Sequence, residues 1–576
     1  MILAGICWMA ITPFLVWGSP SGHDFEFHMF SWMDVLSQWK QGIVYPRWAA
    51  LAHWGYGEAR FLFYPPGSWT LGAALGAILP WGMVPGAYCW IVLTAAGMSM
   101  YALARQWLRP ADALFAAAFY ALNPYHLLIV YWRSAYAELL AGALLPLVLL
   151  YLVRLKQDGS RPTLCLSLAL AGAWLINGPA ALMIHYSVAG LAVLFAVREK
   201  SARPLIRTTL AVVLGAGLAS FYLVPAVYEE GWVNIGQVLS AGVSPQDNFL
   251  FMTIADPDHN RFNMLVSVVA LAEIAILAFM VWAARRAARD KDAPDKDTPR
   301  RDAWMLFSVL GAATAFVMLP ASNLLWEHLP KFRYVQLPFR WLLWMNVPLA
   351  VLLAAATARP SDDQSSSQRS NDPSGPRPIS RPETSRPAFI GWAARALVFV
   401  FLLAVLLYAG HRLQPPWWDA SRDIAQMSDA VSSGAGYEGT DEYVPVAADP
   451  YEIKNNLPRV SDENGAAVTV QMLRWNATEK HFVARSSRAQ NLTVRLFNYP
   501  AWEVLVNGKR VETLTSDVTG LLTIPVPAGE NDVCVHFGST PDRPVGGIVS
   551  LFSIAVLGVG WKITRTFSPK IPRAES

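Results

Sequence analysis

Four ionisable side chains near the start of the chain, His23, Asp24, Glu26 and His28, stand among aromatic residues. If this stretch is helical, Asp24 and His28 lie on one face because they are four positions apart, and Glu26 is rotated away. A carboxylate partly buried under aromatic residues beside an imidazole is suited to general-base catalysis. Asp24 could also cap the helix by accepting hydrogen bonds from free backbone N–H groups, and the two roles are compatible. We predict Asp24, His28 and Glu26 as the catalytic candidates.

Two arginines follow in the same part of the chain, Arg47 and Arg60, in segments rich in aromatic residues, Gly and Pro. Such segments are typical of an amphipathic helix and a folded-back loop at the headgroup level of a membrane. An arginine there could bind a lipid phosphate through two parallel hydrogen bonds. Plain anchoring in the headgroup layer is the alternative for either residue.

Two later segments add further charged candidates. Arg133 and Glu138 precede an apolar run; they could simply pair, but both are expected to face the same cavity as the first loop. Lys331, Arg333 and Arg340 place three cations among aromatic residues at the mouth of another apolar run. Such a cluster suits a lipid phosphate or pyrophosphate, although snorkelling of long cationic side chains to the membrane surface would produce the same pattern.

The composition shows what kind of molecule must position these residues. Of 576 residues, 54% are hydrophobic and only 15% are charged, mean hydropathy is +0.30 and there are 24 Trp. A soluble domain carries about 25% charged residues, so a soluble enzyme, a disordered scaffold and a small disulfide-rich secreted protein are excluded. The net charge of +4 gives no indication of nucleic-acid binding, and the four cysteines have neither metal-ligand nor disulfide spacing. The chain is predicted to be a polytopic membrane protein.

A bilayer core about 30 Å thick needs roughly 20 apolar residues per helix. The first apolar run has no basic segment before it and no small-residue cleavage site, so we expect a retained helix. We expect a mainly α protein, a bundle of about 12–13 transmembrane helices. The thirteen candidate runs are 2–18, 67–84, 86–104, 111–130, 135–153, 162–176, 178–197, 207–226, 263–284, 303–320, 339–358, 388–409 and 546–563.

Lysines and arginines in short loops mark the cytoplasmic side of a membrane. The basic short loops all fall on one side if the run 67–84 does not fully cross and the other twelve runs do. The Gly, Ala and Pro content of 67–84 favours an interfacial or re-entrant helix. We therefore expect the tail 564–576 to be cytoplasmic and four segments to lie together outside, namely 19–66, 227–262, 321–338 and 410–545.

Two segments differ from the spans and divide the chain into domains. Residues 359–387 are rich in Ser, Pro and Arg with almost no apolar residues, so we predict a disordered cytoplasmic linker between a core at 1–358 and a helix at 388–409. The second half of 410–545 has alternating apolar runs around an Asn507-Gly508 turn, the pattern of a β-hairpin. We predict an extracytoplasmic β-sandwich there, followed by a last span at 546–563.

The motifs that the chain lacks also limit its function. The sequence has no phosphate-binding Walker loop, no dinucleotide-binding glycine motif, no HExxH and no CxxC. Within the spans the clearest ionisable groups are Glu273 and His185, whereas proton-coupled carriers generally need charged relays at mid-membrane. The polar chemistry is gathered at the outer surface instead.

Several motifs together resemble a known group of proteins. Gly22-His23-Asp24 with His28, Tyr45-Pro46-Arg47 and Phe63-Tyr64-Pro65-Pro66 are similar to the YfhO-type, GT-C-like multi-spanning bacterial proteins. They also resemble membrane proteins labelled as 6-pyruvoyl-tetrahydropterin synthase-related, although the His-rich zinc constellation of pterin-synthase chemistry is missing. Further segments of the same resemblance are Asn123-Pro124-Tyr125, Arg133 to Glu138, Gln336 to Trp341, Asn498 to Val504, Asn507-Gly508-Lys509 and Pro527 to Glu530.

The resemblance implies a GT-C glycosyltransferase that takes its sugar from a polyprenyl-phosphate donor. Asp24 matches the acidic residue that such enzymes place in the first outer loop, although Asp24 and Glu26 are split by Phe25 instead of being adjacent, which leaves the base and a possible divalent metal undecided. The phosphate would be bound by Arg333 or Arg340, with Arg47 as the alternative. The expected acceptor is an envelope glycan, lipid or protein on the outer face of a bacterial inner membrane.

Two other functions remain open from the sequence alone. A lipid-linked glycan flippase or transporter would share the many spans and the basic mouth, but it would need a hydrophilic path across the bilayer. A non-catalytic membrane partner in envelope polysaccharide assembly would retain its function without the Asp24 carboxylate and would depend on the β domain.

Overall fold

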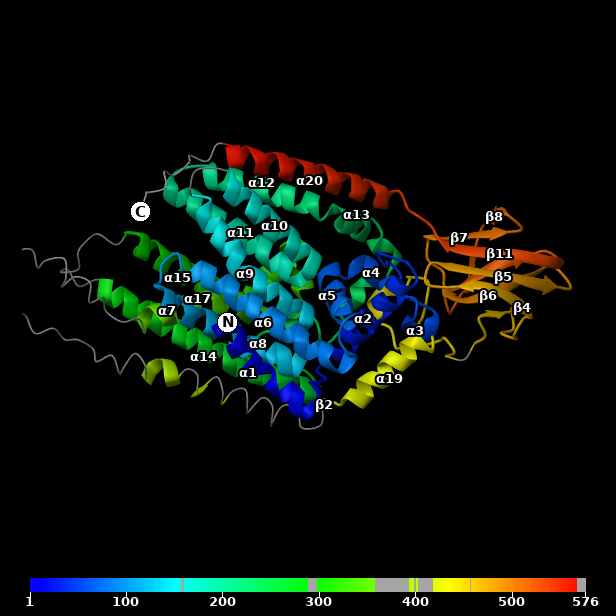
Figure 1. The fold of residues 1–576 in the computed structure, drawn as a ribbon, viewed down its shortest axis with the longest axis horizontal. Helices are drawn as coiled ribbons and strands as arrows, with labels where there is room; N and C mark the ends of the chain where they lie inside the picture. The colour runs from blue at the N-terminus through cyan, green and yellow to red at the C-terminus, as the bar shows by residue number, and fades with distance from the viewer. Residues whose placement is uncertain are drawn as a thin grey trace, which may run out of the picture.

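The computed structural model describes residues 1–156, 160–288, 298–357, 418–455 and 457–566, together with a few residues between 393 and 404. It has an elongated shape with a helical bundle at one end and a β-sandwich at the other (Figure 1). The predicted class, a mainly helical membrane protein with a C-terminal β domain, is confirmed. The predicted linker at 359–387 and most of the predicted span at 388–409 lie outside the described residues.

Among the described residues, seven helical segments have the length and apolar composition needed to cross a membrane, and two bent helix pairs raise this to nine. Two further apolar helices, α1 (Ile2–Trp17) and α10 (Arg161–Ile176), have 16 residues each, about 24 Å of helix. The number of spans therefore remains a prediction. The longer elements are α6 (Val84–Ala104), α7 (Pro110–Ala121), α9 (Tyr136–Arg154), α11 (Gly178–Glu199), α12 (Arg203–Leu218), α14 (Pro257–Ala288), α15 (Thr298–Val317), α17 (Leu342–Ala356) and α20 (Asp542–Thr566).

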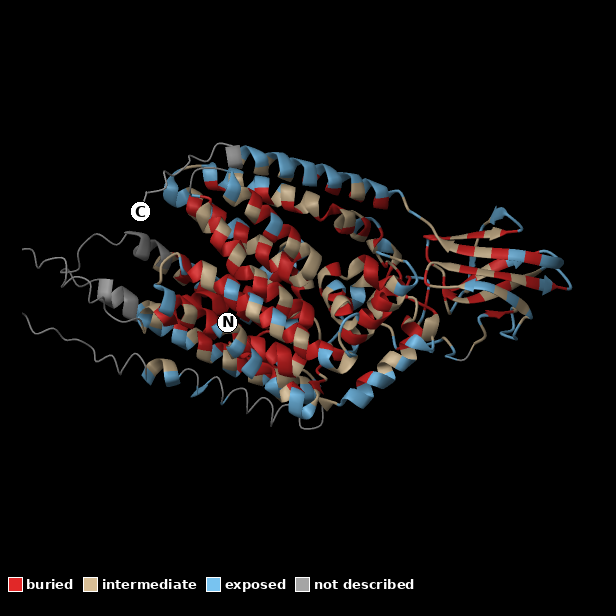
Figure 2. Ribbon diagram, viewed as in Figure 1, coloured by how far each residue is buried: buried red, intermediate tan, exposed pale blue. Residues whose placement is uncertain are grey.

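Residues inside the bundle are mostly buried, whereas the outer helices are largely exposed (Figure 2), and many of their exposed residues are apolar. α20 shows this most clearly: Ile548, Leu551 and Phe552 are each about two-thirds exposed. A water-soluble protein rarely exposes contiguous apolar patches of this kind. A lipid environment along α20 accounts for them.

Two predicted spans, 111–130 and 207–226, are broken in the structure, and a third, 303–320, ends at a sharp bend. The run 111–130 is divided into α7, α8 (Pro124–Leu128) and a π-helical turn, η2 (Ile129–Arg133). The break after α7 has a local cause, because Asn123 caps α8 through its side chain and Pro124 occupies the first helical position. α12 bends by 77° into α13 (Ser220–Tyr228), and α15 is followed across a 92° bend by α16 (Asn323–His328).

The first outer loop folds into short helices between the bundle and the sandwich (Figure 1). They are α2 (Phe25–Lys40), α3 (Ala52–Gly55), α4 (Arg60–Phe63) and α5 (Pro66–Gly76). α5 covers the first part of the run 67–84, which ends in a separate 3-10 turn at Trp81–Met83; the 11 residues of α5 rise only about 16 Å. That length is too short to cross a bilayer.

The C-terminal domain consists of two antiparallel sheets. One has the strand order β3-β6-β10-β9 and the other β4-β5-β11-β7-β8. The alternating apolar runs predicted from the sequence coincide with β5 (Glu479–Ser486), β6 (Gln490–Phe497), β7 (Trp502–Val506), β10 (Leu521–Val526) and β11 (Gly529–Phe537), and the remaining strands are β3 (Val460–Ser461), β4 (Val470–Trp475), β8 (Lys509–Val511) and β9 (Leu514–Thr515).

The β-sandwich packs directly against the first outer loop. Trp48, Tyr56 and Leu62 of that loop belong to the same apolar cluster as the sandwich core. A second connection is the pairing of β1 (Ser19–Pro20) with β2 (Trp418–Asp419), which is followed by α19 (Ser421–Ser432) packed against α2. The sequence analysis did not predict α19.

Candidate functional site

The loop that carries Asp24 is fixed to the turn after the π-helical segment η2. The backbone N–H of Gly22 donates to the Ser134 hydroxyl at 3.0 Å, and that hydroxyl donates to the carbonyl of Pro20 at 2.8 Å. The backbone N–H of Asp24 donates to the carbonyl of Arg133 at 2.8 Å. Ser134 has a left-handed φ of 50°, which ends the helix and turns the chain toward this loop. The position of Asp24 is therefore set by the backbone.

Asp24 precedes α2 at the N-cap position, but its side chain makes no capping hydrogen bond. One carboxylate oxygen, Oδ1, lies 3.1 Å from His23 Nδ1, and the other, Oδ2, lies 3.7 Å from Nη2 of Arg133. Its side chain remains 30% exposed, whereas that of Arg133 is only 6% exposed. The helix-cap alternative for the Asp24 side chain is thus wrong, and the carboxylate faces a buried cation.

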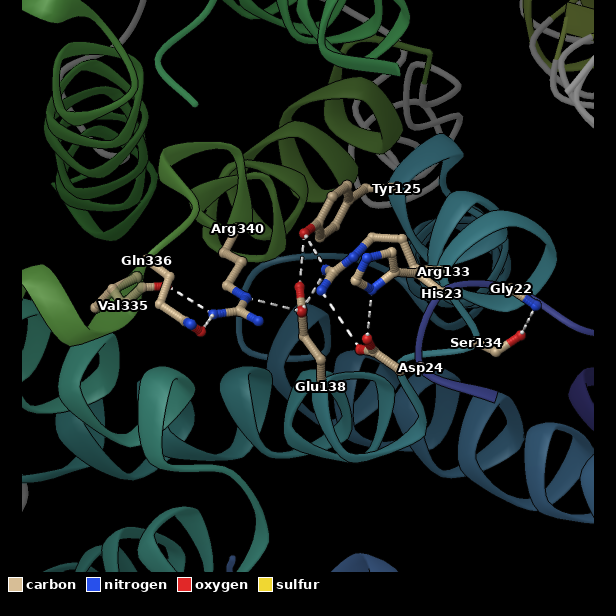
Figure 3. A network of polar contacts seen from close by, with 10 residues as sticks. All are labelled: Gly22, His23, Asp24, Tyr125, Arg133, Ser134, Glu138, Val335, Gln336 and Arg340. Carbon is tan, nitrogen blue, oxygen red and sulfur yellow. Dashed lines mark hydrogen bonds and ion pairs between the residues drawn. The ribbon is translucent and has the colours of Figure 1, made fainter. Parts of the chain in front are cut away.

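Glu138, near the start of α9, is the centre of the adjoining cluster (Figure 3). It accepts hydrogen bonds from the hydroxyl of Tyr125 at 2.6 Å, from Nη1 of Arg133 at 2.6 Å and from Nε of Arg340 at 3.1 Å. Its side chain is 2% exposed. A buried carboxylate with two cations and a hydroxyl is fully satisfied, so Glu138 serves to hold the two arginines in place.

Arg340 is held by its own segment as well as by Glu138. Its Nη1 donates to the carbonyl of Val335 at 2.7 Å and to Oε1 of Gln336 at 2.9 Å. The Gln336 amide in turn donates to the carbonyl of Val238 at 2.6 Å. These contacts use Nε and Nη1, and Nη2 has no hydrogen-bond partner among the described residues. Arg340 therefore keeps one donor group for a further anion.

The ionisation of this site follows from its charges. Burial would raise the pKa of Asp24, but the hydrogen bond with His23 and the positive charge of Arg133 outweigh it and hold that pKa well below its usual range. Burial lowers the pKa of His28 to about 4. The hydrogen bond with Asp24 raises the pKa of His23. Near pH 7 Asp24 is consequently ionised and His28 is neutral.

His28 is buried among aromatic rings next to Asp24. Its ring centroid is 5.3 Å from that of Tyr136 and 6.1 Å from that of Tyr64. Tyr64 is only partly buried and belongs electrostatically to this group, because the charges of Asp24, Arg340 and Glu138 all act on its hydroxyl. Tyr64 was part of a motif noted in the sequence, but we did not predict it as a site residue.

The other predicted residues lie elsewhere. Glu26 is exposed on α2, where the charges that act on it are those of Asp419 and Glu438. Arg333 is exposed and its guanidinium lies 5.6 Å from the ring centroid of Tyr334. Arg47 lies over the ring of Tyr45 at 5.1 Å, and the charges acting on it come from a different cluster, formed by Arg543, Glu229 and Asp542.

A second buried polar network contacts α2 and was not predicted from the sequence. Arg60, which is 1% exposed, donates to Glu58 at 2.5 Å and to the Ser31 hydroxyl at 2.9 Å. Its guanidinium also lies 4.4 Å from the ring centroid of Phe27. Glu58 is fully buried and accepts from the backbone N–H of Thr440 at 2.8 Å. Arg60 is thus a structural residue and not a ligand for lipid phosphate.

The same network holds the segment that leads into the β domain. The Tyr437 hydroxyl donates to Oδ2 of Asp34 at 2.8 Å, and the Gln38 amide donates to Oδ1 at 3.0 Å. Residues 437–443 therefore lie across the outer face of α2. The sequence signal for this contact is weak, since its members are single polar residues in otherwise unrelated segments.

Among the described residues, no group of three or more His, Cys, Asp or Glu side chains could hold a metal ion. The predicted site residues Asp24, Arg133, Glu138 and Arg340 come together, with His28 behind Asp24. The arrangement can hold an anion at Arg340 and accept a hydrogen bond from a hydroxyl at Asp24.

The fold was compared with solved structures. ArnT from Cupriavidus metallidurans, bound to undecaprenyl phosphate, is 10% identical over 75% of this chain and 74% of its own, with a TM-score of 0.39. The mycobacterial arabinofuranosyltransferase AftD is 15% identical over 94% of this chain but only 42% of its own, with a TM-score of 0.46. The oligosaccharyltransferase AglB from Archaeoglobus fulgidus, in complex with an inhibitory peptide and a dolichol-phosphate, is 11% identical over 76% of this chain and 56% of its own, with a TM-score of 0.35.

No curated protein sequence matches the chain. One protein family matches residues 61–365, more than half of its length, and is described as a 6-pyruvoyl-tetrahydropterin synthase related domain of membrane proteins. The matched region contains Tyr64, Arg133, Glu138 and Arg340 of the site and begins after Asp24. The chain belongs to this family of 6-pyruvoyl-tetrahydropterin synthase related membrane proteins.

Proposed function

We propose that this protein is a membrane glycosyltransferase that transfers a sugar from a polyprenyl-phosphate donor to an acceptor hydroxyl. The observation that carries the proposal is the state of Asp24: its carboxylate is ionised, 30% exposed and fixed by backbone contacts beside two buried arginines. A hydroxyl that approaches Asp24 can donate to it while an anionic leaving group binds at Arg340. The sequence resemblance to GT-C glycosyltransferases supports the same chemistry.

The proposed reaction is a single displacement at the anomeric carbon. The acceptor O–H donates to Asp24, its oxygen forms a bond to the anomeric carbon, and the bond from that carbon to the phosphate oxygen breaks with its electron pair. A carboxylate of low pKa is a weak base, so the proton moves only as the new C–O bond forms and the hydroxyl becomes acidic. The neutral imidazole of His28 is the second proton acceptor of the site.

The leaving phosphate gains charge as the bond breaks. Arg340 is already oriented by Glu138, Val335 and Gln336, and preorganised cations stabilise charge as it develops. Arg333 is exposed on the same segment and could meet the phosphate at the membrane surface. We place the reaction on the extracytoplasmic face of a bacterial inner membrane, with an envelope glycan, lipid or protein as acceptor.

Ionisable groups in the described spans give little support to a transporter. Glu273 accepts a hydrogen bond from the Asn346 amide at 3.0 Å, and Nδ1 of His185 lies 2.7 Å from the carbonyl of Ala181 in its own helix. Each group has a local hydrogen-bond partner, and among the described residues no ionisable side chain pairs with either of them. We therefore favour the transferase over a flippase.

The test uses the purified full chain in lipid nanodiscs, a panel of radiolabelled polyprenyl-phosphate sugars and cell-envelope extract as the source of acceptor. We expect Asp24→Asn to lower label transfer by about 100-fold or more, the range for loss of a general base. Glu26→Gln is the matched control, because Glu26 is an exposed carboxylate two positions from Asp24 and lies away from the cluster; it should retain wild-type transfer.

Two results would contradict the proposal. Full transfer by a folded Asp24→Asn protein would remove Asp24 from the reaction, and loss of transfer in Glu26→Gln would move the base to Glu26. If the wild type transfers no label from any donor while acceptor is shown to be present, the flippase or the non-catalytic partner replaces the transferase.

A further inference from the structure

A cavity lies at the end of the bundle that is farthest from the β domain. It has a volume of about 190 Å³ and is bounded by the end of α9, the end of α11 and the start of α12. Glu138 lies near the start of α9 and Lys156 lies just after its end; the helix has 19 residues, about 28 Å. The cavity is therefore separated from the Asp24 site by nearly the thickness of a bilayer core.

The lining of this cavity is cationic. Lys156, Arg203 and Arg207 contribute three positive charges, and Glu199 contributes the one carboxylate among the described lining residues. Nζ of Lys156 lies 3.3 Å from Oε1 of Glu199, and Nη1 of Arg207 donates to the carbonyl of Leu155 at 2.6 Å. Arg203 is exposed at the start of α12. Arginine and lysine around a cavity of this size are suited to a phosphate group.

An apolar strip leads away from the cavity along the same helix. Ile206, Leu210 and Val213 are each 57–65% exposed and recur at the spacing that places them in one row with Arg203. On the neighbouring α11, Val193 and Val197 are 52% and 71% exposed. A cationic cavity at the head of an exposed apolar strip matches a molecule with an anionic head and hydrocarbon chains.

We propose that this cavity binds the phosphate headgroup of an anionic membrane lipid, with the lipid chains lying along α12. Among the described lining residues Lys156 is paired with Glu199, so the exposed Arg203 is the cation that favours a headgroup with net negative charge over a zwitterionic one. The proposal is independent of the transferase activity, because none of these residues belongs to the Asp24 cluster.

The test compares lipids that remain bound to the full chain. Protein in nanodiscs of phosphatidylcholine and phosphatidylglycerol is released into the gas phase, and the retained lipids are counted by native mass spectrometry. We expect phosphatidylglycerol to be enriched on the wild type and Arg203→Gln to lower that enrichment about fivefold, the effect of one cation near a lipid phosphate. Arg109→Gln is the matched control, since Arg109 is an exposed arginine at the start of α7; it should leave the enrichment unchanged.

A second variant changes binding in the opposite direction. Glu199→Gln removes the one negative charge from the described lining and frees Lys156, so phosphatidylglycerol retention should rise. Equal retention in the wild type and in Arg203→Gln, or a fall in Glu199→Gln, would overturn the proposal. Displacement of the lipid by inorganic phosphate at millimolar concentration would identify a site for a small free anion and would also overturn it.

Discussion

At the scale of single residues, Arg133 is the side chain on which the site depends most. It contacts Glu138 through Nη1 at 2.6 Å and approaches Asp24 through Nη2 at 3.7 Å. A planar guanidinium reaches two carboxylates at once, and a lysine ammonium does not have this geometry. Asp24 and Glu138 are far apart in the sequence, but both lie next to the Arg133 guanidinium.

We expect Arg133→Lys to lower label transfer strongly while leaving the protein folded, because the charge on Glu138 stays paired but the contact with Asp24 is lost. Arg133→Met should in addition destabilise the protein, but by less than the about 3–5 kcal/mol of a buried charge left without any partner, because Arg340 and Tyr125 still contact Glu138. Transfer assays and thermal unfolding in detergent measure the two effects. Equal transfer rates for the wild type and Arg133→Lys would show that the contact with Asp24 has no role.

A second residue-scale prediction concerns Lys480 in the sandwich, which is 3% exposed. Burial lowers its pKa to about 7, and the nearby charge of Arg459 acts in the same direction. The unfolded chain therefore holds more protons than the folded one between about pH 7 and the ordinary lysine value of 10.5, so the Lys480 contribution becomes more favourable as pH rises through this window. Below about pH 7 Lys480 is protonated in both the folded and the unfolded protein, so the full free-energy cost of burying its charge is present.

We therefore expect Lys480→Met to stabilise the protein by about 2–4 kcal/mol at pH 7 and to lose most of that advantage by pH 10. Chemical unfolding of the wild type and the variant at the two pH values measures this difference. A constant difference between pH 7 and pH 10 would mean that Lys480 is not held with a lowered pKa.

Individual residues of the site were predictable to different degrees. The type and spacing of Asp24 and His28 identify them from sequence, because their relation depends on one short helix. The sequence does not show which arginine lies near Asp24, because this depends on how distant segments pack. The candidates Arg47, Arg333 and Arg340 all have aromatic residues as sequence neighbours. Of these three arginines, only Arg340 forms a direct ion pair with a buried carboxylate, that of Glu138, and no local pattern reveals this contact.

At the scale of elements, the loop before α2 depends on a close approach to the turn at 132–134. A Cβ atom on Gly22 would lie 2.2 Å from the carbonyl oxygen of Trp132. No side chain can rotate away to relieve this contact, because it involves backbone atoms. A larger residue at position 22 would therefore displace the loop without changing any charged residue.

We expect Gly22→Ala to shift Asp24 away from Arg133 and to lower transfer by about tenfold or more, because displacements of about 1 Å carry large kinetic costs. Gly190→Ala in α11 is the matched control, because nothing lies within 4 Å of its Cβ position. The two variants are compared for transfer and for melting temperature. Wild-type transfer by Gly22→Ala would show that the loop tolerates the shift.

The elements themselves were predicted well where a pattern is local and continuous. The apolar runs of α6, α9, α11 and α14 and the alternating strands β6 and β10 follow from hydrophobic periodicity. The breaks within predicted spans were not predicted, because the apolar composition of a run does not show where a helix ends inside it. In the run 111–130 the signal was present as Asn123-Pro124, a cap followed by a favoured first helical residue.

At the scale of the whole molecule, the first loop and the sandwich are connected by buried charges. Burial would raise the pKa of Glu58, but Arg60 and then His53 outweigh it, and the pKa lies below its usual range. The stabilisation is therefore complete above the ordinary value near pH 4.5 and is lost as the pH falls through the lower folded value. The connection should therefore weaken only below the ordinary glutamate value of about pH 4.5.

We expect Glu58→Gln to destabilise this junction by about 3–5 kcal/mol, because Arg60 is left buried without its charged partner. Glu530→Gln is the control: its partner Arg485 is 81% exposed, and exposed ion pairs contribute about 1 kcal/mol or less. Limited proteolysis between residues 437 and 455 reports on the junction, and unfolding reports on the total. Equal stability of the two variants would mean that the buried pair does not hold the domains together.

The joining of the two domains was the part least accessible to sequence reasoning. The sandwich and the bundle were each predicted from their own patterns. Nothing in either pattern indicates that Tyr437 contacts Asp34 or that Trp48 enters the sandwich core. Such contacts depend on the complete three-dimensional arrangement, and each involves a single residue in each segment.

The pairing of β1 with β2 and the contact of Tyr437 with Asp34 have a consequence for how the protein is made. Asp34 and Tyr437 are 403 positions apart, so a ribosome adding about 5–20 residues per second needs roughly 20–80 seconds to supply the second after the first. During that time the newly inserted first loop lacks residues 418–443 that will lie across it. The nascent chain therefore carries the charged groups of this loop, Asp34, Glu58 and Arg60, without the segment that covers them until about three quarters of the chain has been made.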